Sequence, residues 1–227
     1  MSERGAERQA GVRVKLWDGP VRFVHWALVV LIAFSWWSSE DHLNWHRWSG
    51  YAIIGLVLFR IWWGFAGGDA ARFSSFVKGP RAIAAYARTL PRRDLAVTPG
   101  HNPLGALSVI AILIVLVVQV TLGLFAVDID AFEAGPLSYL VSFETGRRIS
   151  EWHELNFRIL QGLVVLHVLT IAFYAVWKRT NLLGPMITGR RELPSDPGLA
   201  GAPWWRFVVG VVLAAGAAWL LSKGLRL

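Results

Sequence analysis

The sequence predicts an all-α integral membrane protein, and three observations support this fold class. Hydrophobic residues make up 55% of the 227 residues and charged residues only 17%, and a soluble chain with that composition would not stay in solution. Five apolar segments each approach the roughly 20 residues that cross a bilayer as a helix. Thirteen Trp residues are present, a residue type that concentrates where membrane meets water.

The five predicted spans cover residues 23–37, 45–65, 104–127, 149–177 and 207–221. The first and last are short and need flanking Trp residues to reach the interfaces, whereas the fourth is long enough for its first turn to project from the membrane. Residues 70–90 place Phe73, Phe76, Val77, Ile83 and Tyr86 between basic residues. This pattern is typical of one or two short helices that lie on the membrane surface.

Basic residues are distributed unevenly between the two sides of these spans. Sixteen Lys and Arg precede the first span or lie in the loops after the second and fourth, whereas five lie on the other side. Because basic residues accumulate on the cytoplasmic side, the pattern predicts a multi-pass protein with a cytoplasmic N-terminus and an external C-terminus. The same asymmetry explains the net charge of +8 without a nucleic-acid partner.

The predicted outer loop between the third and fourth spans is rich in acidic residues. They are Asp128, Asp130, Glu133, Glu144 and Glu151. An acidic outer face suits docking of a basic soluble partner, but an ordinary solvated loop explains the same residues, and the sequence does not decide between the two.

The absence of cysteine limits the chemistry available to this chain. It excludes disulfides, iron–sulfur clusters, thiolate-bound haem and covalently attached c-type haem. Any redox cofactor must therefore be held by other ligands.

Four of the six histidines occupy two depths in the predicted spans. His25 lies near the inner end of the first span, and His46 and His153 lie near the outer ends of the second and fourth. His167 follows His153 on the same helix by fourteen residues, which is about 21 Å further in and about 40° around the axis. The pairs His46/His153 and His25/His167 therefore predict two non-covalent, bis-histidine haems stacked across the bilayer.

Other interpretations of the histidines remain. A single histidine at a helix end is usually an interfacial or capping residue, and His42 competes with His46 as the outer ligand. The spacing shows no close cluster of the kind that binds zinc. His101 and Asn102 precede the third span, where Asn102 suits the N-cap and Pro103 the first helical position. The same two residues would also suit the polar lining of a quinone site.

Two arginines lie at the inner level. Arg22 is one turn before His25, and Arg60 follows His46 by fourteen residues on the same helix face. Either suits a haem propionate, since guanidinium binds carboxylates through two parallel hydrogen bonds, although snorkelling to the headgroups also explains Arg60. Small residues that permit close packing of helices or porphyrin, without proving either, are Gly50, Gly55, Gly105, Gly123, Gly162, Gly210, Ala214 and Ala218.

The chain resembles the bacterial cytochrome b561 and nickel–iron hydrogenase b-type cytochrome family. The resemblance covers residues 13–191 and rests on several motifs in order: VKLWDGPVRFVHW (14–26), HRWSGY (46–51), FRIWWGF (59–65), ARFSSF (71–76), GHNPLG (100–105), the fourth-helix histidines and MITGR (186–190). It implies a bacterial inner-membrane protein of the respiratory chain, with a four-helix core holding two b haems. The implied axial iron ligands are His25, His46, His153 and His167.

The resemblance also implies a domain division and a function. Residues 1–191 would form the di-haem four-helix domain with a cytoplasmic arm, and residues 192–227 a linker and a fifth transmembrane helix that only some relatives have. We expect an electron-transfer subunit without a catalytic residue, which connects the quinone pool to a periplasmic c-type cytochrome, dehydrogenase or hydrogenase. The alternatives are a superoxide:ubiquinone oxidoreductase and a haem-free membrane scaffold.

Overall fold

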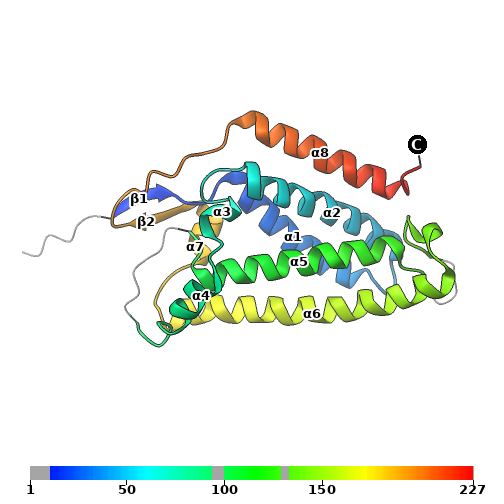
Figure 1. Ribbon diagram of the computed structural model, residues 1–227, viewed down its shortest axis with the longest axis horizontal. Coiled ribbons are helices and arrows are strands. Elements are labelled where there is room, and N and C mark those ends of the chain that lie inside the picture. The colour runs from blue at the N-terminus through cyan, green and yellow to red at the C-terminus, as the bar shows by residue number, and fades with distance from the viewer. Residues whose placement is uncertain (1–10, 94–99, 129–132, 227) are drawn as a thin grey trace, which may run out of the picture.

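The computed structural model describes residues 11–93, 100–128 and 133–226 as a mostly helical protein (Figure 1). Within these described residues, five helices are long and apolar enough to cross a membrane: α1 (Gly19–Trp37), α2 (Leu43–Ala66), α5 (Pro103–Phe125), α6 (Phe143–Val176) and α8 (Trp204–Ser222). The predicted all-α membrane fold is therefore confirmed as a mostly helical protein with five candidate membrane-spanning helices.

Polar caps mark the starts of three helices, of which α1 and α6 begin earlier than the apolar pattern alone indicates. The Asp18 carboxylate accepts the Val21 N–H at 2.8 Å ahead of α1, and the Ser142 hydroxyl accepts the Thr145 N–H ahead of α6. Asn102 caps α5 by accepting the Gly105 N–H at 2.8 Å, as predicted. Each cap satisfies a backbone donor that lacks an intrahelical partner. The start predicted for α6 at residue 149 was wrong by six residues for this reason.

Helix α2 lies at the centre of the packing and contacts α1, α5 and α8, while α5 and α6 lie side by side (Figure 1). The small residues of α8 face α2. A Cβ added at Gly210 would lie 2.3 Å from the Trp62 ring, and one at Gly55 would lie 3.6 Å from the Ala218 Cβ. The Gly210–Ala218 face therefore packs on the rest of this chain.

Short elements gather at the two ends of the bundle and give them different characters (Figure 1). One end, here called the sheet end, holds the antiparallel pair β1 (Val12–Lys15) and β2 (Arg190–Leu193) with α3 (Phe73–Phe76), α4 (Pro80–Ala87) and α7 (Leu183–Thr188). The other, the loop end, holds residues 126–128 and 133–142, with the 3-10 turn η1 (Ser138–Leu140), and the end of α8. Helices α3 and α4 lie in the stretch where one or two short helices were predicted, and their position on the membrane surface stays a prediction.

The antiparallel strand pair was not predicted from the sequence. Each strand has only four residues and forms its hydrogen bonds with the other strand, which lies far away in the sequence. Gly189, just before β2, adopts a left-handed conformation with φ 76°. Its carbonyl accepts the N–H groups of Leu16 and Trp17, so the strand pair closes directly onto the start of α1.

Candidate functional site

Four histidines form two pairs inside the bundle, and the two rings of each pair face each other. The two pairs lie at different depths. Between them lies a layer of buried aliphatic side chains from α2, α5 and α6, made of Ile53, Val57, Leu116 and Leu160. The structure thus brings His25, His46, His153 and His167 together in the two pairs that helical geometry predicts, and it separates the pairs by an apolar layer.

The loop-end pair joins His46 of α2 to His153 of α6. Their ring centres lie 6.1 Å apart with the ring planes at 82°. The Nδ1 atom of His46 lies 2.8 Å from the Ser35 carbonyl oxygen, and that of His153 lies 3.0 Å from the Gln119 carbonyl oxygen. A carbonyl accepts only from a protonated nitrogen, so both rings keep Nε2 as the basic atom, the usual arrangement of a metal-binding histidine.

Helix α5 fixes the orientation of His153. The Gln119 side-chain amide lies 3.1 Å from His153 Nε2, and Asn156 donates to the Gln119 side-chain oxygen at 2.7 Å. At Gly123, an added Cβ would lie 3.0 Å from His153 Cε1, whereas at Gly50 and Gly162 it would meet nothing within 4 Å. Gly123 is therefore the small residue whose lack of a side chain makes room for this imidazole.

A cavity of about 500 Å³ opens beside the loop-end pair, between α1, α2, α5 and α6. Its deep part is aliphatic and aromatic, with Ile53, Leu116 and Phe157 among the lining residues, and charged side chains line its mouth. This volume lies within the range of pockets that enclose drug-sized ligands and cofactors. An apolar ring system with polar edges fits such a lining.

The sheet-end pair joins His25 of α1 to His167 of α6. Their ring centres lie 6.5 Å apart with the planes at 51°. The Nδ1 atom of His25 is buried without a hydrogen-bond partner. Two imidazoles that bind one metal ion from opposite sides, with metal–nitrogen bonds of about 2 Å, have ring centres about 6 Å apart, so both pairs have a separation that suits a single metal atom.

The side chains available as ligands limit the kind of metal ion that could bind between these histidines. The described residues contain no group of three or more His, Cys, Asp or Glu that would hold a metal ion. Zinc and calcium sites built from side chains need such groups. Two facing imidazoles without further protein ligands fit instead a haem iron, whose porphyrin supplies the remaining ligands.

Two arginines at the sheet end form no ion pair among the described residues, although the Asp18 carboxylate lies close enough to Arg60 to interact with its charge. Arg22 donates to the Ile187 carbonyl at 2.6 Å, but its Nε is buried without a partner. Arg60 is only 8% exposed, and it donates to the Ala71 carbonyl at 3.4 Å. A buried guanidinium is costly without an anion. Both arginines therefore fit an incoming carboxylate, and the burial of Arg60 argues against snorkelling.

His101 and Asn102 also lie at the sheet end. The His101 ring lies between Trp17 and Phe76, with both ring-centre distances at 4.6 Å, and its Nδ1 is buried and unpaired. Burial, followed by the positive charge of Arg60, lowers the pKa of His101 to about 3, so the ring stays neutral near pH 7. Asn102 combines its cap with a second bond, from its amide nitrogen to the Tyr174 hydroxyl at 3.0 Å.

His42 lies apart from the paired histidines. It is exposed just before α2, with its ring centre 5.5 Å from that of Trp37 and 6.0 Å from that of Trp45. Sequence reasoning missed Gln119, Asn156, Tyr86 and Tyr174. A signal was present for Gln119 and Asn156, because strongly polar residues inside apolar spans usually have a specific partner.

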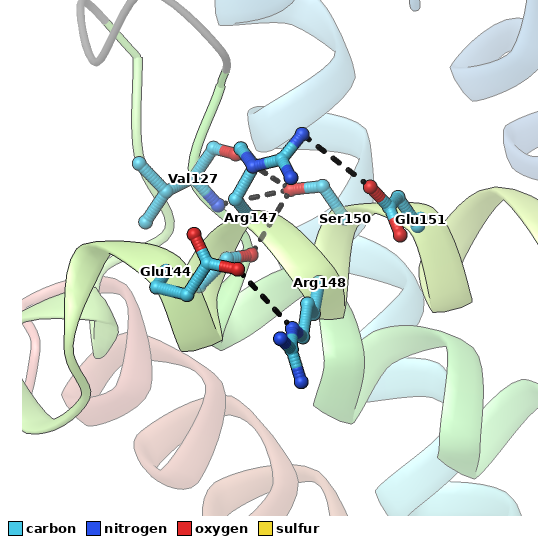
Figure 2. Close-up of polar contacts among 7 residues, drawn as sticks. Val127, Glu144, Arg147, Arg148, Ser150 and Glu151 are labelled. Carbon is cyan, nitrogen blue, oxygen red and sulfur yellow. Dashed lines mark hydrogen bonds and ion pairs between the residues drawn. The ribbon is translucent and has the colours of Figure 1, made fainter.

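The acidic residues of the loop end are largely neutralised by arginines. Figure 2 shows Arg147 and Arg148 of α6 reaching in different directions, each to a glutamate one turn away: Arg147 to Glu151 at 3.5 Å and Arg148 to Glu144 at 3.3 Å. Arg47 pairs with Glu133 across the cavity mouth. Asp130 of the predicted acidic loop lies outside the described residues. The described part of this loop thus does not form a uniformly acidic face.

Comparison with known proteins agrees with this geometry. The model of the family described as prokaryotic cytochrome b561 matches residues 16–189, a range that begins just after β1 and ends just before β2. No curated protein and no solved structure matches the chain significantly.

Proposed function

The chain belongs to the prokaryotic cytochrome b561 family, whose members bind b-type haem in the membrane and transfer electrons, and on this basis we propose that it binds two haems, one at each histidine pair. The observation that carries the proposal is the pair of facing imidazoles at 6.1 Å and at 6.5 Å. Helices α1, α2, α5 and α6 would form the haem-binding bundle within residues 1–191, and residues 192–227 would add a linker and α8.

A bound b haem supplies a one-electron iron couple, and this chain supplies its position and surroundings. His46 and His153 would hold the loop-end haem, with their Nδ1 atoms fixed by backbone carbonyls. His25 and His167 would hold the sheet-end haem, with Arg22 and Arg60 at its propionates. Since His153 and His167 lie about 21 Å apart along α6, the two sites form a path across the apolar layer.

The distribution of basic residues supports an orientation for this path. Most Lys and Arg lie toward the sheet end, which the positive-inside rule places in the cytoplasm. The loop end then faces the periplasm of a bacterial inner membrane. Electrons would pass between a periplasmic c-type cytochrome, dehydrogenase or hydrogenase at the loop end and quinone at the sheet end.

The sheet-end residues support a quinone site. A neutral His101 both donates and accepts, so its unpaired Nδ1 suits a quinone or quinol oxygen. The flanking Trp17 and Phe76 rings suit a flat headgroup. Asn102 would contribute mainly by positioning the neighbouring Tyr174 hydroxyl, since both ends of its amide already have partners.

The superoxide:ubiquinone alternative receives less support from the loop end. Attraction of an anion needs a positive potential near the haem. The arginines that would supply it, Arg47, Arg147 and Arg148, are each paired with a glutamate. The paired arrangement favours electron exchange with a protein partner.

A dithionite-reduced minus oxidised absorption spectrum of detergent-purified protein, with haem extracted and counted per chain, tests this proposal. We expect a b-type spectrum with two haems per chain, and reduction of those haems by a short-chain ubiquinol. One haem per chain would remove one histidine pair from the proposal. A haem-free protein expressed with ample haem supply would overturn it and favour the scaffold.

A further inference from the structure

Three polar side chains from separate elements form a hydrogen-bonded cluster at the sheet end. The Tyr86 hydroxyl of α4 lies 2.7 Å from the Tyr174 hydroxyl of α6, and the Asn102 amide nitrogen donates to the Tyr174 oxygen at 3.0 Å. Tyr174 is only 6% exposed. Helix α4 has no buried residue, so the cluster connects a buried hydroxyl to a surface helix.

The cluster lies beside the sheet-end histidine pair. Tyr174 follows His167 by seven residues on α6, which is about 10 Å along the axis and within about 20° of the same face. Asn102 directly follows His101, whose unpaired Nδ1 marks the proposed quinone site. The hydrogen bonds therefore run from Asn102, next to His101, through the buried Tyr174 hydroxyl to Tyr86 on α4.

Counting protons shows that the cluster has a spare donor. The two tyrosines carry two hydroxyl protons, and the Tyr86–Tyr174 hydrogen bond uses only one of them. Asn102 donates to Tyr174 and therefore absorbs neither. One hydroxyl proton is thus available for another acceptor, and because a hydroxyl donates and accepts at once, the pair can pass a proton along. A side-chain amide passes a proton along poorly, so the role of Asn102 is to orient the Tyr174 hydroxyl.

We propose that Tyr174 and Tyr86 form a proton relay between the sheet-end surface and a quinone headgroup beside His101. The relay rests on the proposed function, because it serves the quinone reaction at that site. Quinone reduction takes two electrons, delivered one at a time through the sheet-end haem, and two protons from water. For each proton, the Tyr174 O–H bond breaks as an O–H bond forms on a quinone oxygen, Tyr86 reprotonates Tyr174, and water reprotonates Tyr86. Quinol oxidation runs the same transfers in reverse.

The competing explanation is that the tyrosines only fasten α4 to α6. Both explanations predict some loss of thermal stability when a hydroxyl is removed, so stability does not separate them. Only the relay predicts that proton transfer becomes slower while electron transfer to a proton-independent acceptor keeps its rate.

The test uses haem-loaded full-length protein with Tyr86→Phe and Tyr174→Phe, and Tyr139→Phe as the matched control. The Tyr139 hydroxyl donates to the Gly224 carbonyl at the loop end at 2.8 Å. Haem reduction by a short-chain ubiquinol is followed by stopped flow in H₂O and D₂O, and haem reoxidation by ferricyanide is followed separately. We expect ubiquinol-driven reduction to slow by about a hundredfold in Tyr174→Phe and Tyr86→Phe, with a larger solvent isotope effect, and Tyr139→Phe to match the wild type.

The outcomes separate this inference from the proposed function. If the wild type takes electrons from ubiquinol and both relay variants keep its rate and isotope effect, the relay is wrong and the proposed function stands. If the haem-loaded wild type takes no electrons from ubiquinol, both are overturned. Equal slowing of ubiquinol and ferricyanide reactions in the variants would indicate damage to the haem site and would also reject the relay. Tyr86→Phe, on the exposed helix, keeps the test decisive should Tyr174→Phe fold poorly.

Discussion

The two histidine pairs have similar separations but contrasting surroundings. At the loop end, backbone carbonyls accept from the Nδ1 atoms of His46 and His153, and the arginines at the cavity mouth are paired with glutamates. The sheet end holds all three buried side-chain nitrogens that lack a partner among the described residues. These are Arg22 Nε, His25 Nδ1 and His101 Nδ1.

At the loop end the protein itself supplies the hydrogen-bond partners, whereas at the sheet end the proposed haem and quinone would supply them. A buried polar group without a partner costs about 1–3 kcal/mol. Ligands that satisfy such groups bind the folded state selectively and stabilise it. We therefore expect haem and quinone to contribute more to the stability of the sheet end than haem contributes at the loop end.

The largest effect should come from removing an axial ligand. His46→Ala or His153→Ala should eliminate the loop-end haem and spare the other, and His25→Ala or His167→Ala should do the reverse. Haem content per chain and reduced-minus-oxidised spectra measure this, with the exposed His42→Ala as the control.

The pairing would be wrong if His46→Ala and His167→Ala removed the same spectral component. Loss of a haem in His42→Ala would reassign the loop-end ligand. Because the unpaired nitrogens lie at the sheet end, the sheet-end variants should also lose more thermal stability than the loop-end variants.

The second effect should come from Arg60→Gln. Loss of the buried guanidinium would remove the charge-assisted bond proposed between Arg60 and the sheet-end haem, so that haem should dissociate about tenfold to a hundredfold faster. Transfer of haem to apomyoglobin measures the rate. The matched control is Arg158→Gln, an exposed arginine whose partner is Glu154 on the same helix. Similar rates for both variants would show that Arg60 does not hold the sheet-end haem.

Helical periodicity explains how much of the fold and the candidate site could be predicted. Fourteen residues on one helix fix both the depth and the facing of His153 and His167, so the two histidine levels followed from the sequence. The spans, the surface helices and the Asn102 cap followed from apolar length and local capping chemistry. All of these depend on residues close together in the chain.

The features that the sequence did not reveal depend on contacts between distant segments. The β1–β2 pair, the Gln119–Asn156 bond beneath His153 and the Tyr86–Tyr174 bond each join different elements. Glycine shows the same limit, because six glycines were candidate positions for close approach. Only the packing shows that Gly123 contacts a paired histidine while Gly50 and Gly162 face open space.

A smaller effect is expected from Gly123→Ala. The added Cβ would lie 3.0 Å from His153 Cε1, so the ring must shift, at a cost of about 1 kcal/mol or more. The loop-end haem should dissociate about fivefold faster, and the sheet-end haem should be unaffected. Gly162→Ala, in open space on α6, is the control, and equal haem release from the two variants would contradict this account of Gly123.

The last prediction concerns the pH dependence of the sheet end. The pKa of His101 falls from the usual 6.5 to about 3 in the folded protein. Between these values the unfolded chain binds a proton that the folded chain does not, so folding stability falls as pH drops below about 6.5. The ring is only half-buried although its Nδ1 is enclosed, so the loss of folding stability at pH 5 should be at most about 2 kcal/mol.

His101→Phe keeps an aromatic ring between Trp17 and Phe76 but does not titrate, and thermal unfolding of both proteins from pH 7.5 to 5 measures the difference. The wild type should lose more stability than the variant over this range, and parallel curves would mean that His101 is protonated as readily in the folded state as in the unfolded state.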